Sequence, residues 1–226
     1  MGKRNHLWQA LKSFFFPRRC PFCGRVLSGD GLLCHRCADD LPITGEHPVE
    51  EGPYGRCAAP LYYERQVRRA VLDFKFRHRM GGLDCFGMLL ADCAAGSFPG
   101  EFDTVTWVPV SPQRQKERGF DQSCELCRAA CRHWDVEPTP TLRKVWDNPP
   151  QSGLHDRAQR RANVLGVYEP IPENIWGRRI LLVDDVCTTG ATMAECARVL
   201  RESGAAEVVC LTLCRTRQGS GRYVDR

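Results

Sequence analysis

An apolar run that ends in two carboxylates is the feature that most constrains this chain. Residues 178–196 read RRILLVDDVCTTGATMAEC, so four aliphatic residues are followed by Asp184 and Asp185, and then by small hydroxyl residues and a glycine. The aliphatic run predicts a buried strand with both carboxylates at its carboxyl end. In open parallel sheets that edge is where ligands bind. The segment therefore predicts a ligand site as well as a fold class.

Strands and helices alternate from about residue 103 onward, which predicts an α/β fold with a parallel sheet flanked by helices. We expect strands at 102–110, 140–145, 165–171, 179–185 and 207–216. The expected helices are 61–80, 85–96, 121–134 and 191–204, with a polar loop at 111–123. The segment 41–55 is rich in Pro, Gly and Glu and is interpreted as a linker.

Two C-x-x-C pairs near the start of the chain predict a metal site formed by Cys20, Cys23, Cys34 and Cys37. Four thiolates suit tetrahedral Zn²⁺ and leave no open coordination position, so the predicted role of the metal is structural. A segment this small buries little core, and metal binding would supply most of its folding free energy. Unligated or redox-active cysteines are the alternative. His35 could replace one ligand, although a solvent-facing histidine is the preferred interpretation.

The other cysteines carry a weaker signal. Cys124, Cys127 and Cys131 follow helical spacing, which favours small buried residues over an iron–sulfur site. Cys187 lies between the acidic pair and the predicted helix. It is the thiol for which reactivity is expected, because a helix N-terminus favours the thiolate.

The chain of 226 residues has a formal net charge of +5, which is weak evidence for a polyanionic partner. Residues 7–20 predict a short amphipathic helix rather than a signal peptide, and no apolar stretch approaches the roughly 20 residues of a membrane span. We expect a cytoplasmic protein with no membrane insertion. Its predicted domains are an N-terminal helix and zinc module at 1–45 and an α/β domain at 46–226, with its core from about 103.

The turn after the acidic pair has the properties of an anion site. Backbone N–H groups at the start of the following helix lack intrahelical partners. Hydroxyl donors and a flexible backbone are supplied by Thr188, Thr189, Gly190 and Thr192. The neighbouring carboxylates can accept hydrogen bonds from sugar hydroxyls, or hold Mg²⁺ through water. One ligand fits both halves, a ribose that carries a 5′-phosphate. The alternative is a purely structural strand end with Thr as a helix cap.

Residues 181–192, LLVDDVCTTGAT, resemble the phosphoribosyl-pyrophosphate (PRPP) motif of type I phosphoribosyltransferases. The resemblance implies a type I phosphoribosyltransferase-like sheet. It also implies that Asp184 and Asp185 are the catalytic candidates, which contact the ribose 2′- and 3′-hydroxyls. The resemblance assigns the 5′-phosphate to Thr188, Thr189, Gly190 and Thr192, and it implies Mg²⁺ bound to PRPP.

Over nearly the whole chain, the order of motifs resembles the ComF family of competence-type proteins. The motifs are the four-cysteine head, VPVSPQRQKERGFDQS at 108–123, QSGL at 151–154 with RRANVLGVY at 160–168, and the PRPP motif. The resemblance implies that Arg114, Lys116 and Arg118 meet pyrophosphate, while solvated basic residues in a loop are the alternative. Asp121 stands where the family commonly has Asn, and Ser111 where it has Pro. Residues 151–163 lie where phosphoribosyltransferases carry a mobile catalytic loop.

Three functions remain open at this point. The first is an enzyme that transfers phosphoribosyl from Mg²⁺·PRPP to an acceptor, for which the sequence shows no site. The second is a single-stranded-DNA-binding protein, because the ComF resemblance implies DNA uptake with a helicase-type partner in the cytoplasm. The third is a sensor of PRPP or a nucleotide without turnover.

The sequence itself gives the DNA-binding hypothesis some support. Residues 62–79 interleave cations that could follow phosphates with aromatic rings that could stack on bases. The cations are Arg65, Arg68, Arg69, Lys75, Arg77 and Arg79, and the rings are Tyr62, Tyr63, Phe74 and Phe76. The alternative is a helix with a buried apolar face and a solvated basic face.

Overall fold

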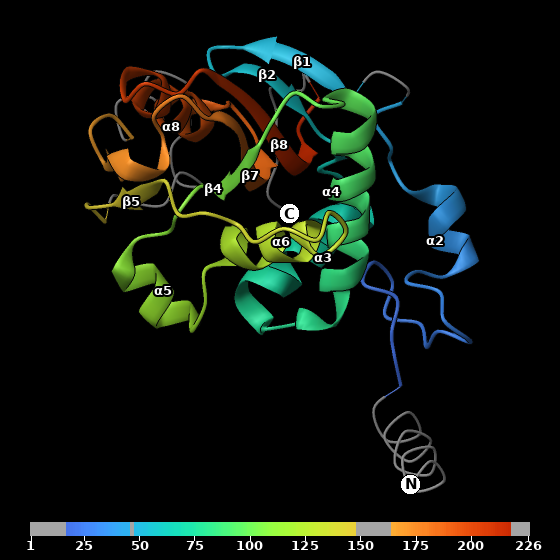
Figure 1. Ribbon diagram of the computed structural model, residues 1–226. Coiled ribbons are helices and arrows are strands. Elements are labelled where there is room, and N and C mark those ends of the chain that lie inside the picture. Colours follow the sequence, from blue (N-terminus) through green and yellow to red (C-terminus); the bar gives the residue numbers. More distant parts are fainter. Residues whose placement is uncertain (1–16, 46–47, 148–163, 218–226) are drawn as a thin grey trace, which may run out of the picture.

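The computed structural model describes residues 17–45, 48–147 and 164–217 (Figure 1). Most of the predicted helix at 7–20 and the whole of the predicted catalytic loop at 151–163 lie outside the described residues. No helix within those described ranges has the length and apolar character that a membrane crossing needs.

A mostly parallel sheet forms the centre of the molecule. Its strands are β1 (Val49–Gly52), β2 (Gly55–Ala58), β3 (Leu61–Tyr62), β4 (Thr104–Trp107), β7 (Arg179–Cys187) and β8 (Glu207–Arg215). The order is β1-β2-β8-β7-β4, and β3 also pairs with β8. All pairings are parallel except β1 with β2. The expected parallel sheet is therefore confirmed, with β7 between β4 and β8.

Helices cover both faces of this sheet (Figure 1). One face packs against α3 (Arg65–Arg77), α4 (Leu83–Ser97) and α6 (Gln122–Cys131), through a core that contains Phe74, Phe86 and Leu126. The other face packs against α8 (Ala191–Glu202), whose Met193 and Leu200 meet Ile180 and Leu182 of β7. Because β7 is covered on both sides, its aliphatic run is continuous rather than alternating.

The predicted linker at 41–55 is wrong for its second half, which contains β1 and the start of β2. β2 pairs with the core strand β8, where Cys57 lies opposite Cys210. β1 is an edge strand of the sheet, and charged residues are common on such edges because they discourage pairing with other chains. The prediction was wrong because β1 contains Glu50 and Glu51, so its composition is that of a linker although it forms a strand.

The strands expected at 140–145 and 165–171 exist but do not join the parallel sheet. β5 (Leu142–Lys144) and β6 (Tyr168–Pro170) pair with each other in an antiparallel two-stranded sheet. The chain runs beside β4 just before β5, where the Thr139 N–H donates to the Val105 carbonyl at 2.8 Å. Pro138 and Pro140 flank that residue and have no N–H group, so the ladder stops there.

The remaining elements are short. They are α2 (His35–Asp40), α5 (Pro112–Arg118) and the 3₁₀ turns η1 (Met80–Gly82) and η3 (Pro172–Asn174). The polar loop expected at 111–123 is thus a helix over most of its length. Ser111 caps α5 by accepting from the Arg114 N–H at 3.3 Å, and Pro112 suits the first helical position.

The N-terminal module packs directly on the α/β core. The ring of Phe22 meets that of Phe86 on α4 at 5.9 Å between centroids, and Phe86 in turn meets Phe74 of α3 at 6.1 Å. Arg69 of α3 donates from Nη2 to the Phe22 carbonyl at 2.7 Å. The module is thereby joined to the helices that cover one face of the sheet.

Candidate functional site

The four predicted metal ligands converge. The sulfur atoms of Cys20, Cys23, Cys34 and Cys37 all lie within 4.8 Å of one another, and those of Cys23 and Cys34 are 3.6 Å apart. Tetrahedral zinc with Zn–S bonds of about 2.3 Å separates its sulfurs by about 3.8 Å, so the spacing fits Zn²⁺. His35 is exposed and does not belong to the cluster, in agreement with the preferred interpretation.

Backbone geometry brings the first two cysteines together. Gly24 has φ +75°, and its N–H donates to the Cys20 carbonyl at 2.9 Å, which closes a tight turn. The second pair sits at the start of α2, where the Cys37 and Ala38 N–H groups both donate to the Cys34 carbonyl at 3.0 Å. The cluster is a structural zinc site that closes the N-terminal module.

The acidic pair lies near the carboxyl end of β7 and is buried. Asp184 is 9% exposed and Asp185 is 4% exposed. Oδ1 of Asp184 accepts from the Ser123 hydroxyl and from the Asp185 N–H, both at 2.8 Å. Burial and the neighbouring Asp185 carboxylate raise the pKa of Asp184 to about 7. The strand itself continues to Cys187, two residues beyond the predicted end.

Asp185 has a different environment. Its Oδ1 lies 2.8 Å from the ammonium of Lys75 on α3, and its Oδ2 is buried with no hydrogen-bond partner among the described residues. Burial lowers the pKa of Lys75, but the attraction of Asp185 outweighs this effect and leaves the pKa above its ordinary value. An unpaired buried carboxylate oxygen is costly, so a hydrogen-bond donor that reaches Oδ2 would be stabilised there.

Contacts with three other residues fix the turn after β7. Gly190 has φ +73° and directly precedes α8, and a Cβ atom there would collide with the ring of Tyr54 from the β1–β2 turn. The Thr189 hydroxyl accepts from the Ala191 N–H at 3.5 Å, and the Thr216 hydroxyl donates to the Thr188 carbonyl at 3.1 Å. Thr192 lies in the first turn of α8. The predicted phosphate-binding residues therefore meet around one helix N-terminus.

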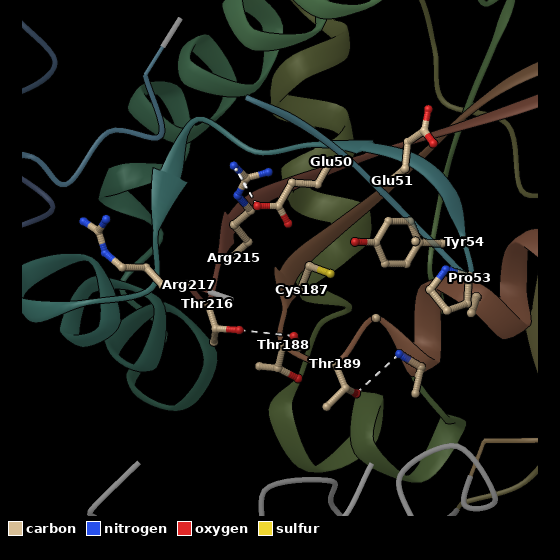
Figure 2. A pocket seen from close by; sticks show the side chains of 14 residues that line it. Glu50, Glu51, Pro53, Tyr54, Cys187, Thr188, Thr189, Arg215, Thr216 and Arg217 are labelled. Atoms are coloured by element: carbon tan, nitrogen blue, oxygen red, sulfur yellow. Dashed lines mark hydrogen bonds and ion pairs between the residues drawn. The ribbon is translucent and has the colours of Figure 1, made fainter. Parts of the chain in front are cut away.

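A cavity of about 320 Å³ opens beside this turn, between the β1–β2 hairpin and the end of β8 (Figure 2). Figure 2 shows the Tyr54 hydroxyl and the Cys187 sulfur turned toward one another across it. Hydrogen bonding with the Cys57 thiol, with a further contribution from Tyr54, lowers the pKa of Cys187. Glu50 and Arg215 form an ion pair of 3.1 Å on the same wall. The sequence did not predict this cavity, because its hairpin was interpreted as a linker.

The predicted pyrophosphate residues separate into two groups on α5. Arg114 and Arg118 are one helical turn apart, so they share a face, whereas Lys116 is exposed. Arg114 lies 3.5 Å from Asp147. Arg118 donates to Gln122 at 2.7 Å and covers the ring of Phe76 at 5.0 Å. Burial lowers the pKa of Arg118 while the Asp185 carboxylate acts against that shift. Of these three residues, Arg118 feels the charge of Asp185, Arg114 shares its helix face, and Lys116 is exposed.

The two departures from the family pattern both have structural roles. Ser111 caps α5 and also donates from its hydroxyl to Asp147. Asp121 caps α6, where its Oδ1 accepts from the Ser123 and Cys124 N–H groups at 3.0 Å. Its Oδ2 accepts from the Val110 N–H at 3.1 Å, which ties the segment after β4 to the start of α6.

Three polar residues near the acidic pair were not predicted as part of the site. Ser123 binds Asp184, Lys75 binds Asp185, and Lys144 at the end of β5 is only 8% exposed. Burial, and then repulsion from Arg114, lowers the pKa of Lys144 to about 8. Its ammonium lies 5.5 Å from the ring centroid of Tyr168. The sequence indicates Lys75 only as a cation that could bind DNA, and no spacing in the sequence connects any of the three to Asp184.

The basic and aromatic series at residues 62–79 divides between internal contacts and an exposed surface, to which Arg77, Arg79 and Phe76 belong. Phe74 is buried, and Arg77 and Arg79 both pair with Asp73, at 3.0 and 2.9 Å. These observations support the alternative interpretation of this segment, a helix with a buried apolar face and a solvated basic face.

Comparison with known proteins gives the family. Residues 125–226 match the phosphoribosyl transferase domain, and residues 11–68 match the double zinc ribbon domain. The chain is 33% identical over 218 residues to the DNA utilization protein YhgH of Escherichia coli O157:H7, covering 87% of this chain and 90% of that protein. It is 27% identical over 201 residues to the competence protein ComFC of Bacillus subtilis, covering 87% and 78%.

Among solved structures, the glutamine phosphoribosylpyrophosphate amidotransferase from B. subtilis aligns with 21% identity and a TM-score of 0.42, over 63% of this chain and 30% of that one. The acidic pair, the helix N-terminus beside it and the four-cysteine module thus occur in a chain that aligns with YhgH and ComFC over most of its length. The chain belongs to the ComF family, with a phosphoribosyltransferase-type domain behind an N-terminal zinc module.

Proposed function

We propose that this protein binds PRPP together with Mg²⁺ at the carboxyl end of β7, in a phosphoribosyltransferase-type site. The observation that carries the proposal is the buried Oδ2 of Asp185, which has no hydrogen-bond partner within the described part of the chain and lies beside a second buried carboxylate. A ribose presents two adjacent hydroxyl donors, which such a pair can accept. The 5′-phosphate would then bind to backbone N–H groups and side-chain hydroxyls of the following turn, at Thr188, Thr189, Gly190 and Thr192.

The pyrophosphate half of the ligand fits the other side of the site. Arg114 and Arg118 on α5 offer guanidinium donors, which bind phosphate oxygens bidentately. Mg²⁺, bound to PRPP, would neutralise part of the pyrophosphate charge. In a transfer reaction the bond between ribose C1 and the pyrophosphate oxygen breaks, C1 bonds to the acceptor, and pyrophosphate leaves. The protein contributes orientation and charge complementarity to that step.

Calorimetric titration of Mg²⁺·PRPP into the zinc-loaded protein tests this proposal. We expect binding by the wild type and a loss on the order of a hundredfold or more in Asp184→Asn/Asp185→Asn, because two hydrogen bonds to charged groups are removed. Asp103→Asn is the matched control, since Asp103 pairs with Arg179 at the opposite end of β7. Equal binding by the wild type and the double variant would refute the proposal.

The same samples distinguish an enzyme from a sensor. Pyrophosphate release that requires an added nucleobase or amine indicates phosphoribosyl transfer and identifies the class of acceptor, whereas release without one indicates hydrolysis of PRPP by water. Tight binding without pyrophosphate release indicates a PRPP or nucleotide sensor.

We further propose a role in DNA uptake or utilization, with single-stranded DNA as a partner. The names of the relatives support this role, and so do exposed arginines on the zinc module and on α3. They are Arg18, Arg19, Arg25, Arg36, Arg65 and Arg69. Arg25 and Arg36 both line a cavity of about 520 Å³ beside the four cysteines.

Fluorescence anisotropy with a labelled oligonucleotide at several salt concentrations tests the DNA role. Binding should weaken with salt, and Arg25→Ala/Arg36→Ala should reduce the logarithmic salt slope by roughly 0.7 for each phosphate that the variant no longer neutralises. Arg143→Ala is the control, because Arg143 pairs with Glu169 on the separate two-stranded sheet. An unchanged slope in the double variant would exclude the cavity that Arg25 and Arg36 line as the DNA site.

A further inference from the structure

We propose that Lys75 is a positioning residue of the ribose-phosphate site, which holds Oδ1 of Asp185 and leaves Oδ2 as the acceptor for a sugar hydroxyl. The inference rests on the function proposed above. The Lys75 ammonium lies 2.8 Å from Oδ1, and the two side chains are 19% and 6% exposed. An ion pair this sheltered is screened far less by water and salt than a surface pair.

The position of Lys75 follows from the packing of α3. Phe74, the preceding residue, is buried against Phe86 and Phe120, which fixes the last turn of the helix against the sheet. Arg77 and Arg79 lie beyond this point and are directed to Asp73. Lys75 is the residue of this turn that reaches the end of β7.

Two adjacent carboxylates in a buried site need separate sources of stabilisation. Asp184 has the Ser123 hydroxyl and a backbone N–H, and Asp185 has the Lys75 ammonium. In each aspartate these contacts are made to Oδ1. The protein groups therefore orient each carboxylate through one of its two oxygen atoms. Removing Lys75 would leave a buried charge without its partner, which is the costly way to break such a pair.

Other groups near Asp185 do not replace this contact. The charged and titratable neighbours whose electrostatic effects are linked to Asp185 are Tyr63, Arg118, Asp184 and Cys214. Arg118 is the other cation in this group, but its guanidinium is engaged with Gln122 and the ring of Phe76. Orientation of Asp185 therefore falls to Lys75.

Two probes, ribose 5-phosphate and inorganic phosphate, test the role of Lys75 by calorimetry. Lys75→Met should weaken ribose 5-phosphate on the order of tenfold to a hundredfold, because the hydrogen bonds between the sugar and the acidic pair no longer form. Inorganic phosphate, which needs only the helix N-terminus, should change by less than about threefold. Lys75→Arg keeps the charge and should retain more of the ribose 5-phosphate affinity. Arg77→Met removes a cation from the same helix and should match the wild type.

Each outcome has a separate meaning. Wild-type affinity for ribose 5-phosphate in Lys75→Met would overturn the inference and leave the proposed function intact. An equal loss for both probes in a folded variant would show a general structural role and would also overturn it. Failure of the wild type to bind either ribose 5-phosphate or Mg²⁺·PRPP would instead refute the proposed function, and the inference with it. If Lys75→Met does not fold, Lys75→Gln supplies the same comparison.

Discussion

The turn after β7 depends on one residue, Gly190, for its closed conformation. Its φ of +73° is a conformation that side chains with a Cβ rarely adopt, and the space a Cβ would need is filled by Tyr54. Tyr54 comes from the β1–β2 turn, more than a hundred residues away in sequence. The backbone at the helix N-terminus is therefore fixed both by its own conformation and by a distant aromatic ring.

Gly190→Ala should consequently destabilise the protein more than an ordinary glycine substitution. We expect a loss of roughly 1–2 kcal/mol from the left-handed backbone and a further loss of about 1–3 kcal/mol from the collision with Tyr54. Gly100→Ala is the matched control, because Gly100 has φ +71° and open space around its Cβ position. Urea unfolding of both variants separates the two contributions. Equal losses would show that Tyr54 moves aside without cost.

Among the helices and strands, sequence periodicity predicted the segments with a regular burial pattern. β7 and β8 are buried on both faces and read as apolar runs, and α8 alternates its faces at helical spacing. The prediction failed where composition and environment diverge. β1 carries two glutamates because it is an edge strand, and α5 was hidden by a run of polar residues that places none of its side chains in the core.

The sequence indicated the contiguous part of the candidate site and missed the residues that come from other elements. Asp184, Asp185 and the residues of the following turn are contiguous in sequence, so their chemistry was visible in one motif. Lys75, Ser123 and Lys144 come from three other elements, and only the packing of α3, α6 and β5 brings them near β7. Local spacing carries no information about such contacts. Lys75 is an example. Its sequence context predicts a cation that binds nucleic acid, whereas in the structure its ammonium pairs with the buried carboxylate of Asp185.

Across the whole molecule, α3 links two distant parts, because it contacts both the zinc module and the acidic pair. Near its start, Gln66 donates to the Asp40 carbonyl at 2.7 Å, and Arg69 donates to the Phe22 carbonyl, also at 2.7 Å. At its other end, Lys75 binds Asp185. Phe22 and Cys20 belong to the same buried cluster as Phe74 and Leu181. The zinc module is thus part of the core that positions α3.

Removal of zinc should therefore affect the distant ligand site. Zinc binding contributes on the order of 10 kcal/mol to the folding of such modules, so the metal-free module should unfold and expose the face of α3 and α4 that it covers. We expect a lower melting temperature for the whole chain and weaker binding of ribose 5-phosphate, measured after the chelator has been dialysed away. Restoring Zn²⁺ should reverse both changes, whereas adding Mg²⁺ alone should not. Two separate unfolding transitions with unchanged ribose 5-phosphate affinity would instead mean that the α/β domain holds α3 in place unaided, and that Phe22 contributes little to the packing of Phe86.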